Sequence, residues 1–168
     1  MSDAEGTAQS CVDDSEYVCR LGFCANENVF RDKGYPQTHD DDGYLRLSEL
    51  SWVDFSEKGF SVQMRSLYSS DDAHAEALRR NQARLERTGV DVGYSVAGCH
   101  AVQVSRVREI KDDVGDEAFC VYDTRTEAQP AHAEIRVASQ IKKADFLKLR
   151  ELLRDTLGKI QPIVFLDH

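Results

Sequence analysis

The chain has 168 residues and a formal net charge of −9, with 41% hydrophobic and 30% charged residues. This length suits one domain with its own core, and the acidic balance argues against bulk attraction to nucleic acid or to an anionic membrane surface. No apolar run approaches the roughly 18 residues of a membrane span, and the acidic start lacks a secretory signal, so we expect a cytoplasmic protein.

The predicted elements begin after an acidic and polar N-terminal stretch. We expect residues 1–15 to form a flexible tail and residues 16–168 to form a single domain. Aromatic, β-branched and cysteine residues in EYVCRLGFC predict the first strand, and the alternation in GFSVQMRSLY predicts the second. Between them, Gly34, Pro36 and Gly43 indicate a loop, whereas YLRLSELSWVDF can begin as a strand and end as a short helix.

A helix over residues 70–88 is predicted from its two ends. Serines at 69 and 70 can cap its N-terminus, two aspartates follow at the positive end of the helix dipole, and Gly89 can end the helix. The apolar stripe that we assign to this helix is thin and comprises Ala75, Leu78 and Leu85. We therefore expect the helix to contact the domain along a narrow line.

The second half of the chain predicts further strands and a second long helix. YSVAGCHAVQV predicts a strand, and AFCVYD and AHAEIRV predict a hairpin around the turn-rich TRTEAQP. A continuous apolar face predicts a helix at about residues 144–157, and PIVFL predicts a last strand. These elements favour an α+β fold, a single compact domain with a mostly antiparallel sheet and two main helices.

The segment THDDDGYLRLSE has the spacing of a calcium loop. With Gly43 at position 6 of a twelve-residue EF-hand loop, positions 3, 5 and 12 are Asp40, Asp42 and Glu49. However, Thr38 replaces the aspartate of position 1, and the preceding glycine and proline would break the entering helix. We favour an acidic turn, and we keep a calcium-stabilised fold through these three carboxylates as an alternative.

His132 and Glu134 are the best candidates for catalysis. They stand two residues apart in a predicted strand, so both side chains lie on one face, where they can support general base chemistry. The alternation of His, Glu and Arg is equally typical of the solvent face of a strand. The cysteines, including Cys99 beside His100, lack the two ligand pairs of a structural zinc site. Because the common nucleotide and hydrolase motifs are also absent, we predict no cofactor and lean away from catalysis.

An arginine row is the clearest candidate for partner binding. Arg80, Arg84 and Arg87 recur at helical spacing in the helix predicted over residues 70–88. Guanidinium groups bind phosphates and acidic protein surfaces, although a solvated helix face is the simpler interpretation. Because the helix has few apolar residues, we assign the predicted partner-binding surface to it.

The segment AFCVYDTRTEAQPAHAEI resembles a group of small uncharacterised bacterial α+β proteins. Those proteins have an aspartate-containing strand, a proline-rich turn and a Pro-Ala-His-Ala strand. Their early arginine-bearing strand, glycine turn and Ser-Val strand are echoed by Arg20, Gly43 and Ser61. The resemblance spans about residues 16–138 and implies a compact α+β domain in a bacterial setting, with no established activity.

A second similarity lies in the order of three residues. Arg20, Ser61 and Glu134 follow the order of functional residues in the arginine-serine-glutamate ADP-ribosyltransferases, although the Ser-Thr-Ser and Glu-x-Glu signatures of that family are absent. With this similarity, the His132 and Glu134 face suggests a small transferase or hydrolase that uses these two residues, with Arg20 orienting an anionic substrate. This is our second hypothesis. The first is a non-catalytic accessory or regulatory protein that binds another macromolecule, with a protein as the expected partner.

Overall fold

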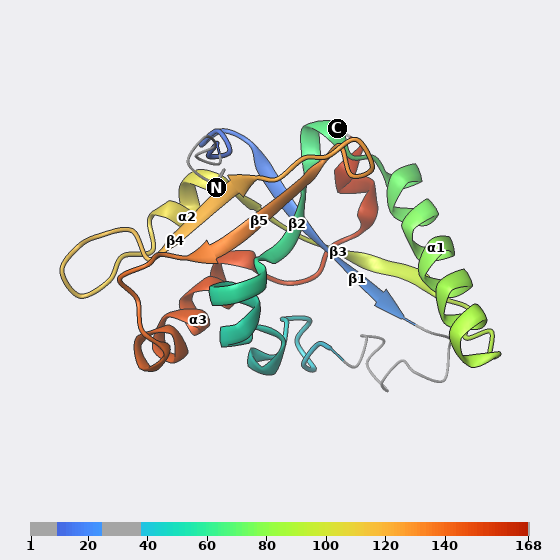
Figure 1. The fold of residues 1–168 in the computed structure, drawn as a ribbon, viewed down its shortest axis with the longest axis horizontal. Helices are drawn as coiled ribbons and strands as arrows, with labels where there is room; N and C mark the ends of the chain where they lie inside the picture. The colour runs from blue at the N-terminus through green and yellow to red at the C-terminus, as the bar shows by residue number, and fades with distance from the viewer. Residues whose placement is uncertain (1–9, 25–37, 168) are drawn as a thin grey trace, which may run out of the picture.

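The computed structural model describes residues 10–24 and 38–167. Within them, five strands form one antiparallel sheet in the order β3-β1-β2-β5-β4, and helices pack on it, which confirms the predicted α+β fold (Figure 1). The strands are β1 (Tyr17–Cys24), β2 (Phe60–Met64), β3 (Ser95–Gln103), β4 (Phe119–Asp123) and β5 (His132–Val137). The α-helices are α1 (Ser70–Thr88), α2 (Val104–Arg108) and α3 (Lys143–Leu157).

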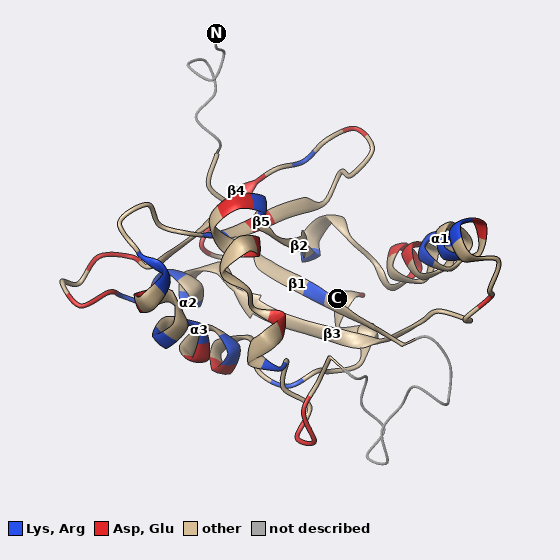
Figure 2. Ribbon diagram, turned by 60° about the horizontal axis from the view of Figure 1, so that its bottom comes forward, with Lys and Arg blue, Asp and Glu red and all other residues tan. Residues whose placement is uncertain are grey.

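Helical segments pack on both faces of the sheet. On one face, α2, α3 and a π-helix (Asp54–Lys58) enclose the main core, which includes Phe55, Phe119 and Phe146. On the other face, α1 and a 3-10 turn (Ile163–Leu166) pack beside β3 around a smaller cluster. Figure 2 shows α1 set apart from α2 and α3. Side chains that alternate along a strand therefore meet two different environments.

The bounds predicted for α1 are confirmed, but its predicted apolar stripe is wrong. Ser69 and Asp72 form a capping box at the N-terminus, and Gly89 ends the helix in the left-handed conformation. The buried residues are Ala73 and Ala77, whereas Leu78 is 69% exposed. Because an α-helix repeats every 3.6 residues, the face of Ala73 and Ala77 continues to the half-buried Arg84 and Leu85, whereas Leu78 points away from it.

Helix α3 and the β4–β5 hairpin lie where they were predicted, but the last predicted strand is wrong. Gln161 pairs with Cys99 of β3 through two backbone hydrogen bonds of 2.9 Å. The next residue is Pro162, which has no N–H group to continue the ladder. The chain therefore leaves the edge of the sheet, and PIVFL forms the 3-10 turn Ile163–Leu166.

Residues 10–15 lie against the edge of β4. The backbone N–H of Val12 donates to the carbonyl of Val121 at 3.0 Å, and the N–H of Asp123 donates to the carbonyl of Ser10 at 2.7 Å. Val12 is buried in the main core. The domain boundary predicted at residue 16 thus falls inside a segment that packs on the sheet, and residues 1–9 of the predicted tail lie outside the described residues.

The last carbonyl groups of the π-helix accept hydrogen bonds from Arg136 of strand β5. The π-helix stops at Gly59, whose φ is 86°. Arg136 donates to the last two carbonyl oxygens of the π-helix at 3.4 and 3.2 Å, and Glu134 forms an ion pair of 2.9 Å with Arg136. A Cβ atom at Gly59 would lie 2.2 Å from Oε2 of Glu134. Glu134 therefore has a structural contact that requires glycine at position 59.

Replacing Gly59 with alanine is expected to lower the free energy of unfolding by about 1–3 kcal/mol through backbone strain, and further because Glu134 must move. Gly115→Ala is the matched control, since its φ is 90° and an added Cβ would meet nothing within 4 Å. Urea denaturation of both variants measures the difference. Equal losses at the two positions would show that Glu134 does not pack on Gly59.

Candidate functional site

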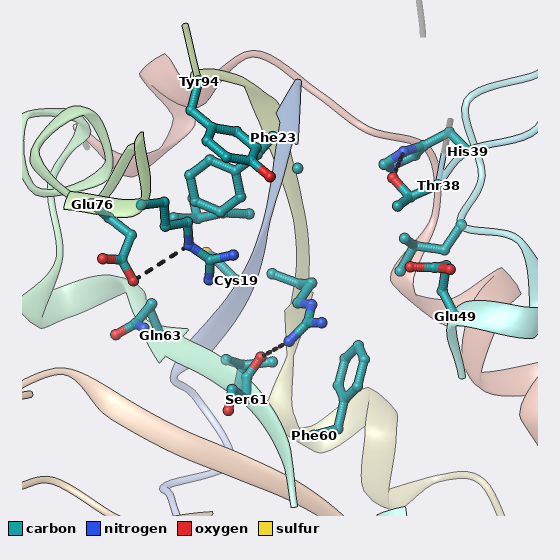
Figure 3. A pocket seen from close by; sticks show the side chains of 16 residues that line it. Cys19, Phe23, Thr38, His39, Glu49, Phe60, Ser61, Gln63, Glu76 and Tyr94 are labelled. Carbon is teal, nitrogen blue, oxygen red and sulfur yellow. Dashed lines mark hydrogen bonds and ion pairs between the residues drawn. The ribbon is translucent and has the colours of Figure 1, made fainter. Parts of the chain in front are cut away.

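A cavity of about 280 Å³ lies where strands β1 and β2 separate. The two strands pair only at Val18 with Met64 and at Cys19 with Gln63, and the cavity is lined by the residues that follow on β1 and precede on β2. Helix α1 and residues 38–49 complete the lining. Figure 3 shows Thr38, His39 and Glu49 across the cavity from Glu76 and Tyr94.

Arg20 of β1 extends into the gap between the strands. Its Nη1 donates to the carbonyl oxygen of Ser61 at 2.8 Å, and its guanidinium carbon lies 4.2 Å from the centre of the Phe60 ring. Within residues 10–24 and 38–167, no carboxylate lies inside the ion-pair distance of 4.0 Å from this group. Burial, and then the charge of Arg80, lower the pKa of Arg20. Arg20 is thus a confined cation with no carboxylate in direct contact among the described residues, although the charges of Asp54 and Glu49 raise its pKa from a longer distance.

Arg80 brings a second guanidinium group from α1 to the rim of the same cavity. Its guanidinium carbon lies 4.3 Å from the centre of the Phe23 ring, and its Nε lies 3.7 Å from Oε1 of Glu76. The other oxygen of Glu76 forms a 3.0 Å ion pair with Arg79. One carboxylate therefore serves two arginines of α1, while no carboxylate of the described residues lies within 4.0 Å of Arg20.

A pair of buried histidines forms the wall beside residues 38–49. His39 lines the cavity, and its Nε2 lies 2.7 Å from Nε2 of His100, with both rings fully buried. Nδ1 of His100 lies 2.8 Å from the carbonyl of Gly158, and Nδ1 of His39 lies 2.8 Å from Oγ1 of Thr38. One neutral arrangement satisfies every atom: His100 donates to Gly158, His39 donates to His100, and Thr38 donates to His39.

Burial lowers the pKa of both imidazoles to about 4, because each neutral ring would become charged away from water. For His100 the neighbouring His39 lowers it further. Both histidines are therefore neutral near pH 7, and the Nε2 atom of each ring is hydrogen-bonded to the Nε2 atom of the other. This leaves the histidines as fixed structure beside the cavity and not as free bases.

The predicted catalytic residues are not brought together at this cavity. The register places Ser61 opposite Glu134 on the sheet face away from the main core, whereas Arg20 leaves the other face of β1, beside His100. Arg20 and Ser61 line the cavity, and Glu134 and His132 do not. His132 is engaged instead by Oγ1 of Thr124, at 2.7 Å from its Nδ1. Arg20 and Ser61 therefore share the cavity, whereas Glu134, although it lies opposite Ser61, does not line it.

The carboxylates of the predicted calcium loop also point to different places. Oδ1 of Asp40 accepts from the backbone N–H groups of Asp42 and Tyr44, and its Oδ2 accepts from Arg154 at 2.8 Å. Glu49 lines the cavity instead. Among the residues that the structure describes, no group of three or more His, Cys, Asp or Glu side chains could hold a metal ion. The segment is the acidic turn that competed with the calcium interpretation.

The arginine row of α1 is divided between two environments. Arg80 and Arg84 face the sheet, where Nη1 of Arg84 donates to the hydroxyl of Tyr94 at 3.0 Å, and Arg87 is exposed. The partner-binding surface predicted for these three arginines stays a prediction: Arg80 reaches the rim of the cavity with a side chain that is 55% exposed, and Arg84 is half-buried. The periodicity of Ala73 and Ala77 with Arg84 was the signal that could have revealed the half-buried position of Arg84.

No protein-family model, curated protein or solved structure matches the chain. The resemblance to small bacterial α+β proteins therefore stays a prediction. Across residues 10–24 and 38–167, no helix has the length and apolar character needed to cross a membrane.

Proposed function

We propose that the protein is a non-catalytic binding protein that holds an anionic group of a macromolecular partner in the cavity between β1, β2 and α1. The observation that supports this proposal is the state of Arg20. Its guanidinium group is confined, is fixed by Ser61 and Phe60, and has no carboxylate within ion-pair distance in the described structure. A charged group in such a position gains most from an external counter-ion.

The cavity is arranged for binding before a ligand arrives. The guanidinium groups of Arg20 and Arg80 lie over the rings of Phe60 and Phe23, which restricts their rotation. Side chains that are already ordered lose less conformational entropy when a ligand binds. The partial exclusion of water from Arg20 also strengthens its attraction to an anion, because the local dielectric constant is lower than that of bulk water.

Three ionisable groups in or near the cavity wall are already engaged. His39 and His100 bind each other, and Glu134 binds Arg136. Ser61 has no histidine or carboxylate recorded as a hydrogen-bond partner of its hydroxyl within the described ranges. A serine nucleophile requires such a base, so recognition of an anion fits the arrangement better than covalent catalysis.

The rest of the molecule favours this position for an anionic partner. The net charge of −9 repels an acidic partner over most of the surface, so a local pair of guanidinium groups also selects where it docks. The association is expected to weaken as salt increases, because the rim of the cavity is open to water.

The proposal predicts that partner capture depends on Arg20 and Arg80. Wild-type protein, the double variant Arg20→Gln/Arg80→Gln and the control Arg106→Gln are immobilised and exposed to an extract of the source cells. Arg106 is exposed on α2 and does not line the cavity. A protein retained by the wild type and the control should be retained at least tenfold less by the double variant, because loss of a confined charge contact costs about 2–5 kcal/mol.

The melting temperatures of the three proteins are measured first, so that a loss of folding is not mistaken for a loss of binding. A partner that is retained equally by the double variant and by the wild type would refute recognition at this cavity.

A further inference from the structure

We infer that the anionic group recognised in this cavity is a phosphate monoester carried on a compact apolar body. The inference rests on the proposed function and names the chemistry of its ligand. Its basis is the combination of two guanidinium groups from separate elements, two polar side chains that form no hydrogen bond within the described residues, and an apolar wall, all lining one small cavity.

The number and position of the cations favour a doubly charged, tetrahedral group. Arg20 approaches from β1 and Arg80 from α1, so an ion between them must accept hydrogen bonds from two directions. A phosphate monoester carries a charge of about −1.5 to −2 at pH 7 and has three terminal oxygens that can accept them. A carboxylate has one charge and two oxygens. Glu76 already supplies a carboxylate to Arg80, so a second one would gain little by replacing it.

Two further donors lie on the same lining. The hydroxyl of Ser61 and the amide of Gln63 are next to each other on the face of β2 that points toward α1, and both line the cavity. In the described part of the chain, neither side chain is recorded in a hydrogen bond. Both can donate to phosphate oxygens, which completes a set of donors that a planar carboxylate could not use at once.

The volume and the apolar lining of the cavity limit the size and polarity of the group that carries the phosphate. The cavity of about 280 Å³ is just below the roughly 300–1,000 Å³ typical of drug-sized ligands. Leu21, Leu45 and Val62 also line it, and Phe60 adds an aromatic face. A phosphate attached to a ring or to a short aliphatic group fits this lining, whether it is a free molecule or a phosphorylated side chain of the partner.

The inference is tested with three ligands that share a phenyl ring and differ in the anionic head: phenyl phosphate, phenyl sulfate and benzoate. Isothermal titration calorimetry at pH 7.5 should give an affinity for phenyl phosphate at least tenfold higher than for the other two. Arg20→Gln should weaken the binding of phenyl phosphate at least tenfold, and Arg106→Gln should leave it unchanged. Because Arg20 is partly buried and its replacement could impair folding, Ser61→Ala serves as a second variant, with an expected loss of about threefold to tenfold.

The outcomes separate this inference from the proposed function. Equal affinities for phenyl phosphate and benzoate, both lost in Arg20→Gln, would overturn the phosphate assignment and leave anion recognition intact. If none of the three ligands binds and partner capture is unaffected by the double variant, both ideas fail. A heptapeptide with a central phosphotyrosine among alanines should bind more tightly than phenyl phosphate if the phosphate belongs to a partner protein, and no more tightly if it belongs to a free molecule.

Discussion

Acidification from pH 7 to pH 4 is expected to lower the free energy of unfolding by roughly 3–6 kcal/mol through the His39–His100 pair, at about 1.4 kcal/mol for each pKa unit. Both rings have a pKa of about 4 in the folded protein, below the ordinary value of 6.5, because they are buried. The unfolded chain therefore binds more protons than the folded protein between pH 6.5 and pH 4. Stability falls as the pH decreases through this window, and the contribution of the pair stops changing below it.

The geometry of the pair explains why protonation is so unfavourable. A first proton on Nδ1 of His39 can be accommodated if the hydroxyl of Thr38 turns to accept it, although a charge is then buried. A second proton on His100 would place two N–H groups against each other at 2.7 Å. That contact cannot form a hydrogen bond, so the wall of the cavity must open.

Urea denaturation at pH 7.5, 6.5, 5.5 and 4.5 measures the loss, and NMR titration of the histidine ring protons measures the two pKa values directly. His74→Gln is the control for the replacement of a histidine, because His74 is exposed on α1 and is not part of the buried pair. Ring protons of His39 and His100 that titrate near pH 6.5 in the folded protein would contradict the prediction. Most carboxyl groups titrate near pH 4 and below, so their effect begins where that of the histidines ends.

Elements whose signals are local could be predicted from the sequence. The bounds of α1 follow from a cap at Ser69 and a left-handed Gly89, and the buried face of α3 follows from the spacing of Phe146, Leu153 and Leu157. The hairpin of β4 and β5 follows from alternation on both sides of a turn-rich segment. In each case, the residues that determine the structure are neighbours in the chain.

The candidate site could not be predicted in the same way, because separate segments assemble it. His39 lies in the calcium-like segment without a role in it, and His100 lies beside Cys99 in a weak zinc pattern, and no local pattern indicates that the two rings meet across 61 positions. Arg20 was selected for the order of residues in a remote similarity. Arg20 lines the cavity because β1 diverges from β2 after Cys19, and this divergence depends on the register of the sheet.

Replacing Phe55 with alanine is expected to lower the free energy of unfolding by about 3–5 kcal/mol, which is a large share of the roughly 5–15 kcal/mol typical of a single domain. Phe55 is fully buried among three other phenylalanine rings. Its ring stacks on Phe60 at a centroid distance of 4.7 Å, and it contacts Phe146 at 5.3 Å and Phe119 at 5.9 Å. Alanine at position 55 would leave a cavity lined by these three rings. The close-packed sheet beside it cannot move far enough to fill this space.

Trp52 provides the measurement, because it is the only tryptophan and its ring lies 5.6 Å from that of Phe146. Its fluorescence during urea denaturation reports the unfolding of this core. Val53→Ala is the matched control, since Val53 is adjacent in the chain but 42% exposed, and it should cost less than about 0.5 kcal/mol. A loss below about 1 kcal/mol in Phe55→Ala would contradict the packing described.

The same substitution connects the core to the cavity. The ring of Phe60 stacks on the ring of Phe55. The same Phe60 ring also supports Arg20, whose guanidinium carbon lies 4.2 Å from the ring centre. If Phe60 loses the ring beneath it, Arg20 loses the surface that restricts its rotation, and the entropic cost of binding an anion increases. Phe55→Ala should therefore weaken the binding of phenyl phosphate under conditions in which the variant is still folded, whereas Val53→Ala should not. Unchanged affinity in folded Phe55→Ala would show that the aromatic core does not position Arg20.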